Sequence, residues 1–132
     1  MNKKSRFLGK LSDPNNTQNI EVNIDLIEYD EDGIFYVYSP AFDLVGYGKT
    51  QGEARESWET VLAEYFKYTS NKKIFVKDLQ DRGWVIKKKK QYISPGISWM
   101  LQNNEQLSEV YNNHDFRKTT KPIAVPLQEA CA

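Results

Sequence analysis

A short glycine-rich segment carries residue types that could bind a nucleotide phosphate. Gly46, Gly48, Lys49 and Thr50 match the end of a P-loop, where lysine contacts the β- and γ-phosphates and a hydroxyl binds Mg²⁺. A P-loop needs another glycine five residues before Gly48, but the residue there is Asp43. A carboxylate at that position would repel phosphate. We therefore interpret the segment as structural.

The same segment has the pattern of a helix start. Thr50 and Glu53 have capping-box spacing. The Thr50 hydroxyl is expected to accept from the N–H of residue 53, and the Glu53 carboxylate from the N–H of Thr50. Gly46 and Gly48 then mark a bulge, or a close backbone approach, at the end of a strand.

Carboxylates in the first half of the chain raise the possibility of a Mg²⁺-dependent nuclease. That chemistry needs acids on the first strand, the first helix and the fourth strand, meeting at two metal ions. Asp25 with Glu53 or Glu56 could supply two of them. The fourth strand, predicted at 84–88, carries lysines instead. We therefore expect no catalytic residue, no metal site, no cofactor and no enzymatic activity.

Four consecutive lysines form a candidate site for nucleic-acid phosphates or an acidic partner, with a solvated strand end as the alternative. They are Lys87, Lys88, Lys89 and Lys90.

His114 is the only histidine and Cys131 the only cysteine. Neither therefore has a second residue of its own kind with which to build a catalytic or metal site.

The overall composition indicates a single cytoplasmic domain. The chain has 132 residues, with 18 basic and 18 acidic side chains, so net charge gives no indication of a nucleic-acid partner. The aromatic content of 13% disfavours disorder. No apolar run approaches the roughly 20 residues of a membrane helix, and the single cysteine suits a reducing compartment.

Residue periodicity predicts an α+β fold. Period-two alternation over 20–26, an aromatic segment at 34–39 and a short segment at 42–48 predict an antiparallel three-stranded meander, with Asp32-Gly33 as its first turn. Apolar residues at helical spacing predict a helix over 51–69. A short helix ending at Gly83 and a fourth strand at 84–88 would follow.

The C-terminal part is predicted to be mainly helical. Ser94-Pro95 is a candidate helix start, and Asn103-Asn104 would separate two amphipathic helices. The segment 121–127 has room only for a short edge strand, because prolines interrupt it. The predicted organisation is an N-terminal extension (1–19), a domain (20–91) and a C-terminal helical extension with that short edge strand (92–132).

Within the predicted domain, the segment 33–66 resembles the HicB-type antitoxin family. That family has an aromatic strand ending at Ser/Cys-Pro, a short Asp-Leu strand, and Gly-x-Thr-x-x-Glu-Ala at a helix start. The matching residues are Pro40, Asp43, Leu44, Gly48, Thr50, Glu53 and Ala54. The resemblance covers roughly residues 20–90 and implies a partly degraded ribonuclease H-like fold (β-β-β-α-β) without nuclease activity.

The resemblance also implies a partner. HicB-type proteins bind and neutralise a small, basic, mRNA-cleaving HicA toxin, and many form dimers or tetramers that repress their own operon. Acidic side chains are the candidates for contacting such a toxin: Asp30, Glu31, Asp32, Glu56 and Glu59. The alternative is a stand-alone HicB-like domain that binds another protein or regulates transcription without a toxin.

The C-terminal part departs from the family's DNA-binding pattern. A ribbon-helix-helix needs a strand before two helices, whereas the only strand predicted here comes last. Helices within 95–113 would suit a helix-turn-helix, but this segment contains no lysine or arginine. The sequence therefore disfavours DNA binding by this part of the chain.

Overall fold

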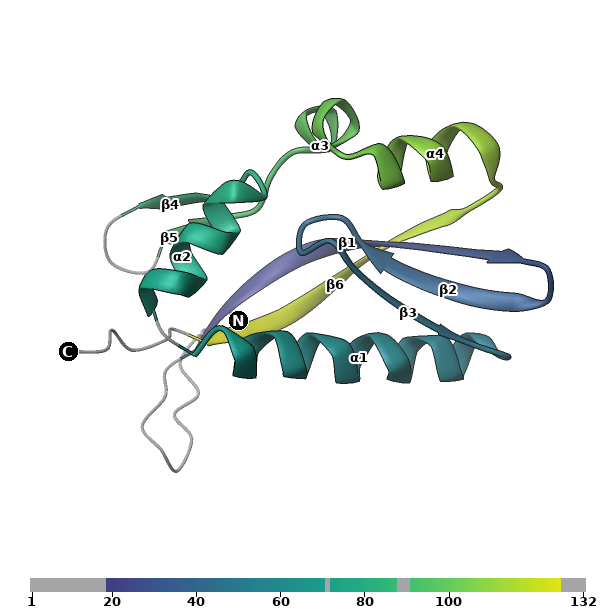
Figure 1. Cartoon of the computed structure of the whole chain (residues 1–132), viewed down its shortest axis with the longest axis horizontal. Helices are drawn as coiled ribbons and strands as arrows, with labels where there is room; N and C mark the ends of the chain where they lie inside the picture. Colours follow the sequence, from purple (N-terminus) through teal and green to yellow (C-terminus); the bar gives the residue numbers. More distant parts are fainter. Residues whose placement is uncertain (1–18, 71, 88–90, 127–132) are drawn as a thin grey trace, which may run out of the picture.

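Six strands and four helices make up the part of the chain that the structure describes. The computed structural model describes residues 19–70, 72–87 and 91–126 (Figure 1). The strands are β1 (Asn19–Glu31), β2 (Ile34–Ser39), β3 (Leu44–Gly48), β4 (Val85–Lys87), β5 (Gln91–Ile93) and β6 (Arg117–Pro126). The helices are α1 (Gln51–Tyr68), α2 (Lys72–Asp81), α3 (Ile97–Asn103) and α4 (Glu105–Asn113). The predicted α+β class is confirmed.

The main sheet is antiparallel, with strand order β3-β2-β1-β6. The predicted meander forms its first three strands. Asp32 and Gly33 connect β1 to β2 with φ of 54° and 81°, as a two-residue hairpin turn with two left-handed residues requires. The β2 strand lies between β3 and β1, as the order of a meander requires.

The fourth strand of this sheet is not the predicted one. The segment 84–88 contributes β4, which pairs with β5 in a separate two-stranded sheet. The fourth position belongs to β6, which pairs with β1 over ten residues. A β4–β5 hairpin closes only a short loop, which costs little chain entropy. The longer β6 can pair with more residues of β1, and it buries Ile123 and Val125.

The β6 strand lies at the sheet edge, as predicted, but is longer than predicted. Both Pro122 and Pro126 lie within it. Proline is compatible with an edge strand when its nitrogen faces away from the neighbouring strand. Pro122 lies opposite Asn23 of β1 and Pro126 opposite Asn19, so both prolines fall on the same set of alternate positions in the ladder.

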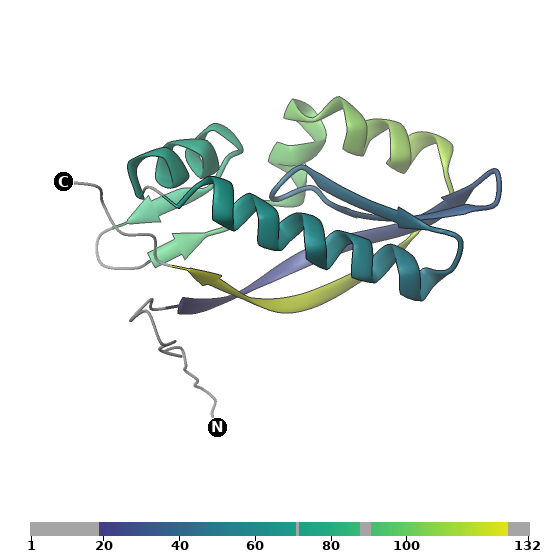
Figure 2. The ribbon, with the colours of Figure 1, turned by 60° about the horizontal axis from the view of Figure 1, so that its bottom comes forward.

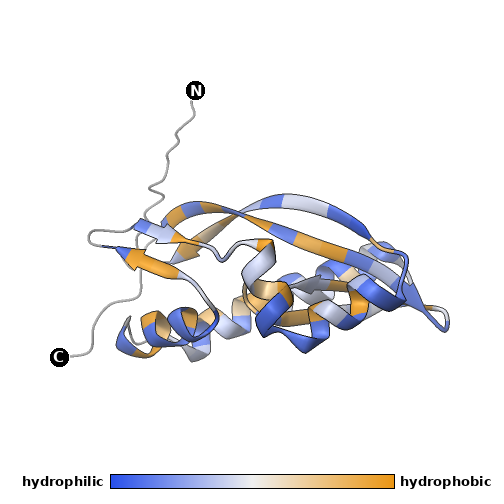
Figure 3. Cartoon of the chain, turned by 90° about the horizontal axis from the view of Figure 1, so that it is seen from above, coloured by the Kyte–Doolittle hydropathy of each residue, from blue (hydrophilic) through white to orange (hydrophobic). Residues whose placement is uncertain are grey.

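Helices cover both faces of the main sheet, with α1 on one side and α3 and α4 on the other (Figures 1 and 2). Alternation along β1 divides its side chains between two cores. Ile24 and Leu26 pack in the cluster that contains Trp58 of α1, whereas Ile27 and Tyr29 pack with Leu107 of α4. Figure 3 shows the corresponding alternation of hydropathy along the long strands.

The α2 helix and the β4–β5 hairpin extend the core on the α1 side. Phe75, Leu79, Trp84 and Tyr92 are buried in the same cluster as Trp58. Gly83 follows α2 with φ of 95°, as the predicted helix end requires. No helix among the described residues is long and apolar enough to span a membrane.

The helix start predicted at Ser94-Pro95 is wrong. The α3 helix begins at Ile97, and its N-cap is Gly96, which has no side chain with which to cap the helix. The predicted break at Asn103-Asn104 is confirmed, because Asn104 separates α3 from α4 and its side chain accepts from Leu107 N–H at 3.1 Å. Residues 1–18 of the predicted N-terminal extension, and Cys131, lie outside the described residues.

Candidate partner-binding site

The P-loop-like segment joins β3 to α1, as the capping interpretation predicted. Thr50 Oγ1 accepts from Glu53 N–H at 3.0 Å. Glu53 Oε1 accepts from the N–H of Lys49 at 2.9 Å, one residue before the predicted donor. A Cβ on Gly48 would lie 2.5 Å from Glu53 Cβ. The glycines therefore allow α1 to pack directly on β3, as the prediction of a close approach required.

The carboxylates considered for a nuclease do not meet. Asp25 Oδ1 accepts from Thr120 Oγ1 at 3.0 Å. Because Ile24 and Leu26 face α1, strand alternation places Asp25 on the opposite face. Glu53 caps α1, and Glu56 is exposed. Among the described residues, no group of three or more His, Cys, Asp or Glu side chains could hold a metal ion.

An ion-pair network around one buried carboxylate lies between the sheet and α1 instead. The Glu28 side chain, only 5% exposed, contacts Arg55 of α1 at 3.1 Å and Arg117 of β6 at 3.5 Å. Thr119 Oγ1 donates to Glu28 Oε2 at 3.3 Å. Two guanidinium groups therefore compensate one carboxylate, and this arrangement suits an internal structural contact rather than metal binding.

Sequence reasoning missed this network, although one signal was present. Glu28 continues the buried alternation of Ile24 and Leu26, so a charged side chain occupies a position that the pattern reserves for an apolar one. A buried carboxylate requires a partner. The partners could not be named, because Arg55 and Arg117 lie 27 and 89 residues away in sequence.

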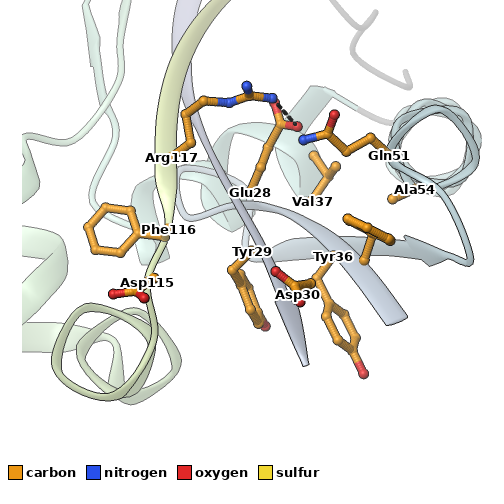
Figure 4. A pocket seen from close by; sticks show the side chains of 11 residues that line it. Glu28, Tyr29, Asp30, Tyr36, Val37, Gln51, Ala54, Asp115, Phe116 and Arg117 are labelled. Carbon is orange, nitrogen blue, oxygen red and sulfur yellow. Dashed lines mark hydrogen bonds and ion pairs between the residues drawn. The ribbon is translucent and has the colours of Figure 1, made fainter. Parts of the chain in front are cut away.

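The β1–β2 hairpin extends beyond the end of β6. Pairing with β6 stops at Glu28 opposite Arg117, whereas β1 continues to Glu31. A pocket of about 260 Å³ lies where β6 begins and the β1–β2 hairpin continues past it. Its lining includes Glu28, Tyr29, Asp30, Tyr36, Gln51, Asp115 and Arg117 (Figure 4). We call the protruding residues Asp30, Glu31 and Asp32 the acidic tip.

The predicted partner-binding acids fall into two groups. The acidic tip is exposed at the β1–β2 turn. Glu56 and Glu59 are exposed on α1, and Glu59 lies 3.6 Å from Lys121 of β6. The tip therefore gathers three of the five predicted acids at the end of one hairpin, and α1 carries the other two.

The predicted lysine site is described only at its first residue. Lys87 is exposed on β4, whereas Lys88, Lys89 and Lys90 lie outside the described residues. The helices α3 and α4 contain no lysine or arginine, and α4 buries Leu107 and Val110 against the main sheet. The apolar face of α4 is thus occupied within the chain.

The motif residue Asp43 belongs to a polar network that links the β2–β3 turn to the helices above it. Tyr38 Oη donates to Asp43 Oδ1 at 2.7 Å, and Asn104 Nδ2 donates to Tyr38 Oη at 2.6 Å. Burial, together with the hydrogen bond to Asp43, raises the pKa of Tyr38 well above its usual value. Asp43 also has a positive φ of 56°, which Asp tolerates better than most residues.

No protein-family model, curated protein or solved structure matches this chain. The geometry assigns local roles to several of the motif residues between 43 and 53. Gly48 lets α1 approach β3, Thr50 and Glu53 cap that helix, and Asp43 accepts from Tyr38. These residues act within the chain, so a partner surface has to be sought elsewhere, and the acidic tip is the first candidate.

Proposed function

We propose that this chain is an antitoxin-like protein that neutralises a small, basic, mRNA-cleaving toxin of the HicA type by binding it directly. The observation that carries the proposal is the acidic tip. Its carboxylates protrude past the end of β6 and are exposed. Complementary charge on a basic partner would accelerate association and orient the complex.

The absence of catalysis is part of the proposal. It is supported by the position of Asp25, which lies on the sheet face opposite α1, and by the compensated charge of Glu28. The composition suggests a cytoplasmic location, and the family resemblance adds assembly into a dimer or tetramer. Occlusion of the toxin would then need only binding and no chemistry by this chain.

Co-expression with the neighbouring gene tests the proposal. The expected result is that a small basic protein is encoded there, that it co-purifies with this chain, and that it stops growth when expressed alone. Growth arrest should be relieved when both proteins are present. The proposal fails if the neighbouring product is neither toxic alone nor retained by this chain.

The alternative is a stand-alone interaction or transcription-regulatory domain. The exposed Lys87 on the β4–β5 hairpin favours this alternative, because phosphate contacts require accessible cations. A gel-shift with the chain's own promoter discriminates between the two. Retardation that weakens steeply with salt, without any neighbouring toxin, would favour the regulator.

A further inference from the structure

Four aromatic rings form a continuous row on the sheet face opposite α1. Tyr47 of β3, Tyr36 of β2, Tyr29 of β1 and His114 after α4 have successive centroid distances of 6.5, 5.1 and 5.1 Å. The rings of Tyr29 and Tyr36 are stacked, with an interplanar angle of 16°. We call these four residues the aromatic row.

The aromatic row runs from a buried end to an open end. Tyr29 is 9% exposed and packs with Leu107 and Val110 of α4. Tyr47 is 64% exposed, and Val45 on the same strand is 41% exposed. Because α3 and α4 leave β3 uncovered, an aromatic and aliphatic surface faces outward at this edge of the sheet.

Strand addition does not account for this exposed surface. An incoming strand would need free backbone groups along β3, but Tyr47 N–H already donates to Ser57 Oγ of α1 at 3.2 Å. At the opposite edge, Pro122 and Pro126 of β6 have no N–H to offer. The aromatic row is therefore better suited to bind side chains than a strand.

Two carboxylates lie at the His114 end of the aromatic row. His114 Nε2 lies 3.3 Å from Glu109 and 3.9 Å from Glu31, and both carboxylates are about half exposed. Glu31 pairs with Ile34, so it is the diagonal neighbour of Tyr36, about 7–8 Å away across the hairpin. These carboxylates repel phosphate, so they disfavour nucleic acid, and they attract a cation placed over the rings.

We propose that the aromatic row, through Tyr47 and Tyr36 with Glu31 as the diagonal neighbour of Tyr36, binds arginine side chains of a basic protein partner. Guanidinium groups stack on aromatic faces and pair with carboxylates in the same plane. This inference rests on the proposed function, because it places the contact with the toxin beside the acidic tip. It adds a specificity that charge alone does not provide, namely arginine over lysine.

A titration with model peptides tests the site. The probes are N-acetylated hexa-arginine, hexa-lysine and a single-stranded oligothymidine, added to isotope-labelled protein and followed by NMR. We expect hexa-arginine to bind more tightly than hexa-lysine, with the largest shifts at Tyr36 and Tyr47. Equal affinity for the two peptides, or tighter binding of the oligothymidine, would overturn the proposal.

Two substitutions locate the contact. Tyr47→Leu should weaken hexa-arginine binding about two- to fivefold, the range for an exposed cation–π contact, whereas Tyr47→Phe should retain it. The matched control is Tyr68→Leu, because Tyr68 is 86% exposed at the end of α1. A Tyr47→Leu variant that binds as tightly as the wild type, or an equal loss in the Tyr68→Leu variant, contradicts the assignment.

Co-purification separates this inference from the proposed function. If the wild-type chain retains the neighbouring toxin and Tyr47→Leu retains it equally well, the aromatic row is not the contact and the antitoxin function stands. If the wild type retains no toxin, the antitoxin function fails, and the peptide titration still decides whether the row binds arginine. Release of the toxin by Tyr47→Leu but not by Tyr68→Leu supports both.

Discussion

A Cβ added to Gly46 of β3 would lie 2.2 Å from the backbone nitrogen of Trp58 in α1. Helix and strand therefore meet backbone to backbone, a distance that only glycine permits. Trp58 is almost fully buried, and its Nε1 donates to the buried Ser39 Oγ at 2.8 Å. This contact holds α1 against the edge of the main sheet.

Gly46→Ala should therefore destabilise the protein. The added methyl group would force α1 away from β3, and we expect the free energy of unfolding to fall by about 3 kcal/mol. Urea denaturation measures this value. The control is Gly52→Ala in the first turn of α1, where the nearest atom lies 3.9 Å away and a gain of up to about 1 kcal/mol is expected. Equal effects at both glycines would argue against the close contact.

The two arginines around Glu28 should act non-additively. Arg55→Gln and Arg117→Gln should each cost about 1 kcal/mol, because each arginine side chain is about half exposed and its charge is partly screened. The double variant should cost more than the sum, because it leaves a buried carboxylate without a counter-charge. A double-mutant cycle from urea unfolding measures the coupling. The control is Lys77→Gln, which removes an exposed pair with Asp81; strict additivity at Glu28 would contradict the prediction.

Stability should fall in alkaline solution. Burial and the acceptor Asp43 raise the pKa of Tyr38, and burial and Asp78 raise the pKa of Tyr65. Because an unfolded tyrosine has a pKa near 10, the unfolded chain releases these protons first. The contribution of both phenols is therefore fully present below about pH 10 and is lost as the pH rises further.

The urea midpoint between pH 8 and pH 11 measures the alkaline loss. Replacing both tyrosines with phenylalanine should flatten the decline above pH 10, even if the variant is less stable at pH 8. A wild-type midpoint that stays constant up to pH 11 would contradict the assignment of these pKa shifts.

Neutralising the acidic tip should slow association with a basic partner. The variant Asp30→Asn, Glu31→Gln, Asp32→Asn keeps the shape of the turn, because Asn tolerates the positive φ of Asp32. We expect an association rate about tenfold lower at low salt, little change in dissociation, and convergence with the wild type at high salt. Stopped-flow binding measures both rates. The pair Glu56→Gln, Glu59→Gln tests the second predicted group; a larger effect there would move the contact to α1.

Local sequence predicted the elements whose geometry depends on near neighbours. The Asp32-Gly33 turn, the Thr50 cap of α1 and the end of α2 at Gly83 all follow from residues within a few positions of one another. Their backbone dihedral angles and hydrogen bonds involve only residues a few positions apart in the sequence. For the same reason, the P-loop-like segment could be assigned to a helix start before its surroundings were known.

Alternation over 20–26 also predicted the first strand, but not which strands lie beside it. The sequence by itself determined the meander, the helix that follows it and the acidic turn between the first two strands. The tertiary structure decided that β6 rather than β4 completes the main sheet, that Arg55 and Arg117 meet Glu28, and that Tyr29, Tyr36, Tyr47 and His114 form one row. These contacts join residues up to about ninety positions apart. Which of the competing pairings forms depends on the total surface that each one buries, and this total cannot be read from a local sequence pattern.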